Sequence, residues 1–318
     1  MSAIAAAQSW VPVTSGTTAN LRGVSAKGQT VWASGEKGTV LKTTDGGMTW
    51  GAAGPKGVAD VDFRDIEAVD ERTVFLLSSG EGPQSRIYKT TDGGASWMLL
   101  ATNLEPKGFW DCMSFWDPTH GIIVGDPIDG RFTILTTSDG LNWQKLKGPQ
   151  ANKDEGAFAA SGSCVFTRGT RDVWFGTGGV GGARIFRSQD GGQTWSVAKT
   201  PMRHDSASAG IFSLAFSDAL NGIAVGGDYM KPQDSTGNVA ITHDEGRTWT
   251  TPAGAGPRGY RSAVSSGGTA TGPSGTDRSD DYGRTWMQAA EAGYNAISGL
   301  WMVGPNGRIA QLMVAILL

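Results

Sequence analysis

A motif of nine or ten residues that ends in tryptophan occurs six times along this chain. The copies are LKTTDGGMTW at 41–50, YKTTDGGASW at 88–97, ILTTSDGLNW at 134–143, FRSQDGGQTW at 186–195, ITHDEGRTW at 241–249 and DRSDDYGRTW at 277–286. Consecutive tryptophans lie 47, 46, 52, 54 and 37 residues apart. A period of about 20–50 residues is typical of a repeat architecture, so the motif constrains the fold of the whole chain.

Each copy has the composition of a hairpin. In the first copy, Val40–Thr43 alternates as a strand does, and the following Asp-Gly-Gly supplies the left-handed positions of a tight turn. The aspartate can accept backbone N–H groups across its own turn, and the tryptophan supplies a large apolar surface for packing between sheets. The paired positions are Asp45 and Trp50, Asp92 and Trp97, Asp139 and Trp143, Asp190 and Trp195, Asp244 and Trp249, and Asp281 and Trp286. Six equivalent positions indicate a structural role and disfavour a catalytic or calcium-binding one.

The third copy differs from the others. It is one residue short, so Asp139 lies four residues before Trp143 instead of five, and Asn142 replaces the usual threonine or serine. The six copies together resemble the Asp-box, or bacterial neuraminidase repeat, with the consensus S/T-x-D-x-G-x-T/S-W. In that repeat the motif marks the hairpin between the third and fourth strands of a β-propeller blade.

The segments between the motifs supply the remaining strands of each blade. The sequence contains seven candidate inner strands but only six motifs, so one blade lacks a motif. The N-terminal segment Ser9–Val13 resembles the second half of a motif and could supply it. We therefore expect an all-β, seven-bladed propeller in a single domain, closed by the N-terminal strand in the last blade, which removes free sheet edges. The approximate blade boundaries are 15–54, 55–104, 105–150, 151–200, 201–254, 255–291, and 292–313 together with 8–14.

Composition and charge limit the function classes. The 48 glycines and 18% charged residues suit short strands and tight turns, and the net charge of −3 disfavours binding to nucleic acid. No stretch has the length and apolar character of a membrane span, and the last apolar run, Met313–Leu318, is short. The N-terminus lacks the charged start of a signal peptide, so the protein is either cytosolic or an exported protein whose signal was removed. We expect a monomer.

Several familiar site types are disfavoured by the residues present. Cys112 and Cys164 fall on inner strands of adjacent blades, one residue out of step, so they are expected to face opposite ways and form no disulfide. Two cysteines and three dispersed histidines make no zinc site. Gly176–Gly181 satisfies G-x-G-x-x-G, but a strand follows it where a dinucleotide site needs a helix. The Arg-Ile-Pro signature of sialidases does not occur. No metal or cofactor is expected.

One group of residues is a candidate binding site. Arg22, Arg64 and Arg261 occupy matching positions of inner strands from nearby blades, so they are expected to converge at one mouth of the central channel. An arginine cluster favours a carboxylate, a phosphate or an acidic protein segment through bidentate hydrogen bonds. The alternative is that rim carboxylates neutralise these arginines within the fold. Other residues expected on this face are Glu36, Lys37, Glu81, Trp110, Asp111, Asp126, Asp129, Arg131, Asp228, Tyr229 and Lys231. The longest connections, 144–160 and 228–237, also reach it, as binding loops often do.

The whole chain, from about residue 9 to 312, resembles the photosystem II stability/assembly factor-like propellers. The resemblance rests on GDPIDGRF at 125–132, FAASG at 158–162, WFGTGG at 174–179, SAGIFSLAF at 208–216 and AVGGDY at 224–229. It implies a seven-bladed propeller, commonly exported, that acts as a scaffold or binding module without an established cofactor. Some members are labelled oxidoreductase, and no motif here supports that activity.

Two functional hypotheses follow. The favoured one is a non-enzymatic binding propeller that recognises a protein partner or an anionic ligand at the channel mouth. The alternative is a hydrolase or lyase acting on glycans or another anionic substrate, because glycosidases use paired carboxyl groups on either side of the scissile bond. Its candidate catalytic residues would be Glu36, Asp126, Asp228 and Tyr229.

Overall fold

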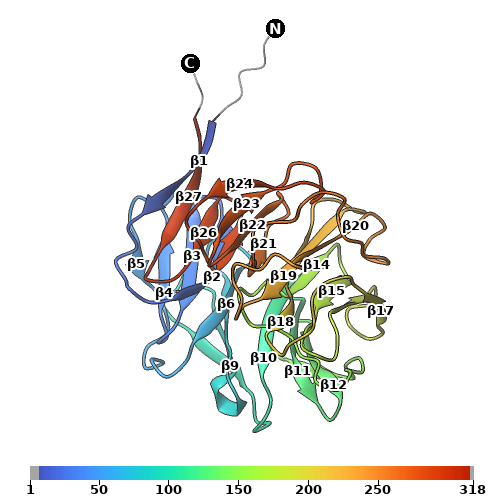
Figure 1. Cartoon of the computed structure of the whole chain (residues 1–318). Helices are drawn as coiled ribbons and strands as arrows, with labels where there is room; N and C mark the ends of the chain where they lie inside the picture. Colours follow the sequence, from blue (N-terminus) through green and yellow to red (C-terminus); the bar gives the residue numbers. More distant parts are fainter. Residues whose placement is uncertain (1–6, 316–318) are drawn as a thin grey trace.

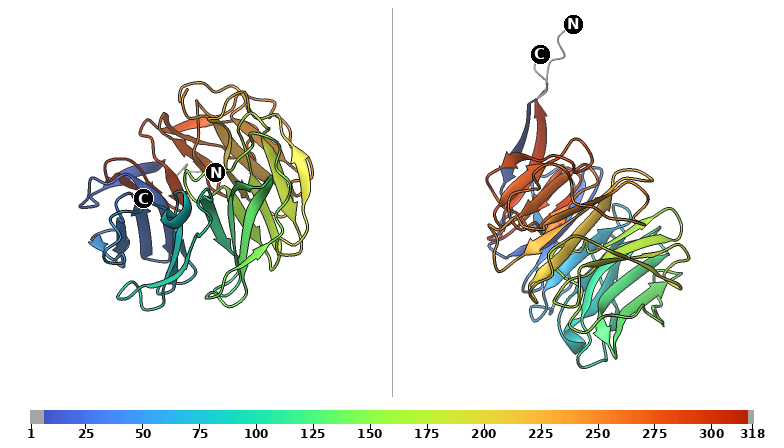
Figure 2. Two further views of the ribbon diagram at one scale, coloured as in Figure 1. Left: turned by 90° about the horizontal axis from the view of Figure 1, so that it is seen from below. Right: turned by 45° about the vertical axis from the view of Figure 1, so that its right-hand side comes forward.

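Seven antiparallel sheets stand in a ring around a common axis in the computed structural model, which describes residues 7–315 (Figures 1 and 2). The first three sheets follow one another along the chain, each running from the axis outward. They are β2 (Leu21–Lys27), β3 (Thr30–Gly35), β4 (Val40–Thr43) and β5 (Gly51–Ala52); β6 (Phe63–Ala68), β7 (Val74–Ser78), β8 (Arg86–Thr90) and β9 (Met98–Thr102); and β10 (Trp110–Phe115), β11 (Gly121–Ile128), β12 (Arg131–Thr137) and β13 (Gln144–Leu146). A short 3-10 helix, η1 (Gly82–Gln84), precedes β8.

The next three sheets continue the ring. They are β14 (Val165–Arg168), β15 (Asp172–Gly176), β16 (Arg184–Ser188) and β17 (Ser196–Lys199); β18 (Ala209–Phe216), β19 (Gly222–Asp228) and β20 (Val239–Thr242); and β21 (Ala263–Val264), β22 (Thr269–Gly272), β23 (Gly275–Arg278) and β24 (Met287–Ala290). The fifth sheet has three strands, and a single bridge between Ile241 and Thr250 stands where its outer strand would be.

The seventh sheet closes the ring with the two ends of the chain. Its order is β1 (Ala7–Val13), β27 (Ile309–Ala315), β26 (Trp301–Val303) and β25 (Ala296–Ser298). The register pairs Trp10 with Leu312 and Val13 with Ile309. In Figure 1 the paired strands β1 and β27 leave the ring side by side. The prediction of a seven-bladed propeller closed by its N-terminal strand is confirmed.

The motif hairpins are held by a repeated hydrogen-bond pattern. In the first copy, Asp45 Oδ1 accepts from the Thr49 N–H at 3.0 Å and Asp45 Oδ2 from the Thr49 hydroxyl at 2.6 Å, while Thr43 Oγ1 donates to Asp45 at 2.7 Å. The turn then needs left-handed backbone, with φ of 69° at Gly46 and 90° at Gly47. In the shortened third copy the Asn142 side-chain amide donates to Asp139 at 2.7 Å, so it replaces the missing hydroxyl.

The motif tryptophans join neighbouring sheets. The Trp97 indole donates to the Ala53 carbonyl at 2.8 Å and meets the ring of Trp32 edge-on, which ties the second sheet to the first. Trp50 meets Trp301 in the same edge-on manner, which ties the first sheet to the seventh. The motif tryptophans therefore pack with buried side chains in the space between adjacent blades.

The two cysteines form a disulfide between adjacent blades, and the prediction that they do not is wrong. The Cα atoms of Cys112 and Cys164 lie 6.0 Å apart. Cys164 precedes β14, so strand alternation does not fix its direction, and a bulge interrupts β10 next to Cys112. The prediction aligned Phe115 with Phe166, but the two strands are displaced from that alignment, because the Ser114 hydroxyl meets the Thr167 hydroxyl at 2.8 Å.

Candidate functional site at the channel mouth

A cavity of about 510 Å³ opens at one end of the central channel. Every blade supplies part of its lining, which places the cavity at the ring centre. Arg22 comes from the first blade, Arg64 from the second, Phe109, Asp111 and Asp126 from the third, Ala157, Phe158, Ala159 and Ala160 from the fourth, Phe212 and Tyr229 from the fifth, Tyr260, Ser262 and Pro273 from the sixth, and Asn295 from the seventh.

Two of the predicted arginines meet in this cavity and share one carboxylate. Arg64 Nε donates to Asp62 Oδ2 at 2.9 Å, and Arg22 Nε lies 3.6 Å from the same oxygen. Within residues 7–315, the buried Arg22 Nε has no hydrogen-bond partner. The pKa of Arg22 is lowered by burial and then by repulsion from Arg64. The pair therefore brings two guanidinium groups to one acid, and both Arg22 Nε and Asp62 Oδ1 lack a hydrogen-bond partner among residues 7–315.

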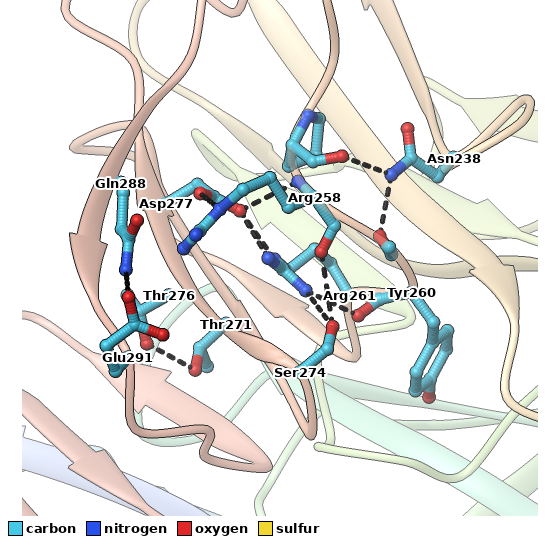
Figure 3. Close-up of polar contacts among 12 residues, drawn as sticks. Asn238, Arg258, Tyr260, Arg261, Thr271, Ser274, Thr276, Asp277, Gln288 and Glu291 are labelled. Atoms are coloured by element: carbon cyan, nitrogen blue, oxygen red, sulfur yellow. Dashed lines mark hydrogen bonds and ion pairs between the residues drawn. The ribbon is translucent and has the colours of Figure 1, made fainter. Parts of the chain in front are cut away.

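The third predicted arginine lies elsewhere, so the expected cluster of three is corrected to two. Arg261 is fully buried inside the sixth blade (Figure 3). Its Nε donates to Asp277 Oδ2 at 3.0 Å, and its Nη1 donates to Ser274 Oγ at 2.7 Å and to the Tyr260 carbonyl at 2.9 Å. The buried carboxylate of Asp277 on β23 pairs with the Arg261 guanidinium and holds it away from the channel mouth. Arg261 serves the packing of its own blade.

Two acidic side chains of the third blade line the cavity. Asp111 is only 1% exposed, and its Oδ2 has no hydrogen-bond partner in the described part of the chain. Burial raises the pKa of Asp111 well above its usual value, Asp126 raises it further, and Arg64 opposes the shift. Asp126 accepts from the Ala157 N–H at 2.9 Å, and burial raises its pKa also. Burial in the cavity therefore disfavours the charged form of both acids.

Aromatic rings form one wall of the cavity. Phe158 stacks on Phe212 with 3.9 Å between ring centroids, and Tyr260 meets Phe212 edge-on at 4.8 Å. Tyr229 also meets Phe212 edge-on and is 48% exposed at the rim. Tyr229 was predicted from the sequence, but the other three rings were not. Phe158 lies in the long connection 144–160, and Tyr260 precedes inner strand β21. Phe212 lies in inner strand β18 at the bulge, the position that Arg22 and Arg64 take in β2 and β6.

The remaining predicted residues do not line this cavity. Trp110 is 5% exposed and packs with the core between the second and third blades. Asp228 is buried and accepts from the Ser208 hydroxyl at 2.6 Å, with Lys231 3.9 Å away. Glu36 accepts from the Asn20 N–H at 3.1 Å, and Arg131 donates to the Gly148 carbonyl at 3.0 Å. Asp129 has left-handed backbone with φ of 51°. Lys37 and Glu81 line an adjoining cavity. Of the three carboxylates nominated for catalysis, the channel mouth holds Asp126.

Metal-binding and membrane-spanning features were also sought. Residues 7–315 contain no group of three or more His, Cys, Asp or Glu side chains arranged to hold a metal ion. Over the same residues, no helix has the length and apolar character needed to cross a membrane.

Comparison with known proteins supports the repeat and the fold. The BNR/Asp-box repeat family matches residues 186–197. The chain carries Asp-box repeats. No curated protein matches it in sequence. A solved structure of an ancestral GH74 enzyme is similar with a TM-score of 0.57 at 17% identity, over 94% of this chain and 41% of that one.

Two solved YCF48 structures are similar to this chain over nearly its whole length. "YCF48 bound to D1 peptide" is similar at 15% identity with a TM-score of 0.46, over 96% of this chain and 97% of that one. YCF48 from Cyanidioschyzon merolae is similar at 15% identity with a TM-score of 0.44, over 95% and 98% of the two chains. At these identities the likeness to all three structures concerns the fold alone.

Proposed function

We propose that this propeller is a binding module that holds an anionic group of a partner or ligand in the channel-mouth cavity. The observation that carries the proposal is the pair Arg22 and Arg64, which share the single carboxylate of Asp62 while Arg22 Nε stays unpartnered within residues 7–315. The Arg22 side chain is 28% exposed and lines the cavity, so the terminal N–H groups of its guanidinium can donate to an entering carboxylate or phosphate.

The rest of the cavity favours a ligand with an apolar or aromatic part beside its charge. Phe158, Phe212 and Tyr260 present ring surface next to the two arginines. Arginine and aromatic side chains from several blades can therefore act on one bound group.

A glycan-active hydrolase or lyase has less support. Such an enzyme needs a carboxylate that stays ionised, as nucleophile or base, beside one that stays protonated. The cavity raises the pKa of both Asp111 and Asp126. Of the carboxylates nominated from the sequence, Glu36 and Asp228 bond to other parts of the fold.

The test measures binding of N-acetyl-phenylalanine and of its primary amide by calorimetry, for the parent and for a double variant Arg22→Gln, Arg64→Gln. We expect the parent to bind the acid and to bind the amide roughly tenfold more weakly, since charge-assisted hydrogen bonds to a guanidinium contribute about 1.5–3 kcal/mol. The double variant should lose this preference. Raising the salt concentration should weaken only the binding of the acid.

The matched control is Arg284→Gln, which removes an exposed arginine from the sixth motif, far from the mouth. It should bind as the parent does. Equal affinity of the parent for acid and amide, or an unchanged preference in the double variant, would disprove the proposal.

A further inference from the structure

A segment of the fourth blade crosses the ring axis. The Phe158 ring stacks on Phe212 of the fifth blade, and the Ala159 carbonyl accepts from Arg64 Nη1 of the second blade at 3.3 Å. The Ser161 hydroxyl donates to the Ser262 carbonyl of the sixth blade at 2.8 Å. In a closed ring, only a segment at the centre can touch the second, fifth and sixth blades within four residues. We call residues 157–163 the plug.

The plug divides the channel into two cavities. Ala157–Ala160 form the floor of the channel-mouth cavity, and Ser161–Ser163 line a second cavity of about 260 Å³ on the other side. At the boundary Gly162 has φ of 75° and lies against the Asp65 carboxylate, where a Cβ would collide with it. The shape of the mouth cavity therefore depends on where the plug lies.

The start of the plug is fixed by a buried acid. Glu155 accepts from the Thr177 hydroxyl at 2.6 Å, from Arg184 Nε at 2.8 Å and from the Asn152 N–H at 2.8 Å. Gly156 then bridges to Gly178. These bonds join the start of the plug to the second and third strands of its own blade.

The end of the plug is fixed by the disulfide. Cys164 follows the last plug residue directly and is bonded to Cys112 on β10. Cys112 Sγ also lies 3.8 Å from the Phe158 carbonyl, so the same cystine touches the plug at its aromatic floor residue. Both cysteines are fully buried in the core between the third and fourth blades.

The plug itself lies outside the strand ladders. The sheets of the third and fourth blades are complete without it. Its own backbone contacts include the bond from the Ala160 N–H to the Phe158 carbonyl at 3.0 Å and the bond from the Ala157 N–H to Asp126. At its other end, the Leu214 N–H donates to the Ser163 carbonyl at 3.1 Å, and the Ser163 and Ser213 hydroxyls meet at 2.7 Å. These are single bonds to several blades and not a continuous ladder, so the plug can open without unpairing a strand.

We infer that Cys112 and Cys164 are positioning residues for the channel-mouth cavity: their disulfide holds the plug in place, and ligand binding depends on it. When the Cys112–Cys164 bond forms, the two thiols lose two protons and two electrons to an oxidant that is itself a disulfide and becomes two thiols. A small dithiol can reduce the protein disulfide again by the reverse exchange. Without the bond, the floor that carries Phe158 and the Ala159 carbonyl must be ordered again whenever a ligand binds. The binding part of this inference rests on the proposed function, whereas the plug's dependence on the disulfide does not.

The test compares the parent with the double variant Cys112→Ala, Cys164→Ala by hydrogen exchange and by calorimetry with N-acetyl-phenylalanine. We expect amides of residues 157–164 to exchange at least roughly tenfold faster in the variant, while those of the Asp-box hairpins keep their rates. Affinity for the probe should fall roughly tenfold, because only the fraction of molecules with an ordered floor can bind. The parent treated with a dithiol under mild denaturant and then returned to buffer should behave as the variant does.

The control is Ile241→Ala, which truncates a buried side chain on β20 in the fifth blade and lowers thermal stability without touching the plug. It should leave plug exchange and probe affinity as in the parent. Unchanged plug exchange in the cysteine variant, or equal acceleration in the control, overturns the inference. If the variant exchanges faster at the plug but the parent binds no probe, the plug's dependence on the disulfide stands and the proposed function fails. If the parent binds the probe and the variant binds it equally, the positioning role fails and the proposed function stands.

Discussion

The Asp-box hairpins at the outer edge and the cavity at the axis use aspartate in opposite ways. At the edge, Asp45 is bonded by Thr43 and Thr49, and these bonds lower its pKa to about 2. At the axis, Asp111 is buried with one oxygen unpartnered among residues 7–315, and burial raises its pKa. The hairpin aspartate is an anion whose oxygens are bonded, whereas burial of the cavity aspartate disfavours its charged form and leaves its Oδ2 without a partner among residues 7–315.

This difference separates the residues that build the ring from those that can bind. Each hairpin supplies its own donors, so the same contacts recur in copy after copy and need nothing from outside the chain. At the mouth, blades contribute different residues to one cavity, and the repeat is broken there. Buried polar atoms without a partner are few in folded proteins. Among residues 7–315 they occur in the motif tryptophans Trp50 and Trp143 as well as at the mouth, but only at the mouth do they belong to charged side chains that line the cavity, Arg22 and Asp111. Function is therefore sought where the repetition ends.

The largest expected effect comes from removing the strand that closes the ring. Deleting residues 1–15 removes β1, whose residues 7–13 pair along β27, and exposes an edge in the seventh blade. We expect the melting temperature to fall by about 10 °C or more, because several kcal/mol of pairing and packing are lost and each changes Tm by about 2–4 °C in a chain of this size. Differential scanning calorimetry measures it. A truncated protein that melts within about 2 °C of the parent would show that the ring does not depend on this closure.

The next largest effect concerns the motif tryptophans. Trp249 is 5% exposed and packs in the core between the fourth and fifth blades, so Trp249→Ala should cost about 3–5 kcal/mol in the free energy of unfolding. Trp143 lies in the shortened motif and is only partly buried, so Trp143→Ala should cost less. Urea unfolding of both variants measures the difference. A loss below about 1 kcal/mol for Trp249→Ala would mean that these tryptophans do not hold the blades together.

The sequence predicts the edge of this molecule better than its centre. The hairpins were predictable because their donors and acceptors lie within five residues of one another and recur six times. Arg261 was misplaced because the carboxylate that captures it, Asp277, comes from another strand of its own blade. The disulfide depends on a bulge in β10, which recurs in β2, β6 and β18 without a shared residue type to reveal it. The plug depends on an irregular segment before β14, which has no counterpart in the Asp-box motif.

A smaller effect tests the aspartate at the axis. Because the folded state raises the pKa of Asp111, the folded protein holds a proton that the unfolded chain releases near pH 4. Stability should therefore fall as the pH rises above that value, and Asp111→Asn, which stays neutral, should escape this loss. We expect the variant to gain stability relative to the parent as the pH rises from 4 to 7. Urea unfolding at both values measures it, and a constant gap would contradict a protonated Asp111.

The smallest expected effect, of opposite sign, is at the edge. The folded state lowers the pKa of Asp45 from 3.8 to about 2, so its contribution is present above about pH 4 and disappears as the pH falls through about 2. The Asp45 carboxylate is exposed to solvent, which screens its charge. Asp45→Asn should therefore lower the melting temperature by only about 1–2 °C at pH 7. That deficit should shrink as the parent's carboxylate takes up its proton near pH 2. Thermal unfolding of both proteins at pH 7, 4 and 2 follows the change. If the deficit is the same at all three values, the ionised carboxylate is not what stabilises the hairpin, and the contrast between edge and axis loses its electrostatic basis.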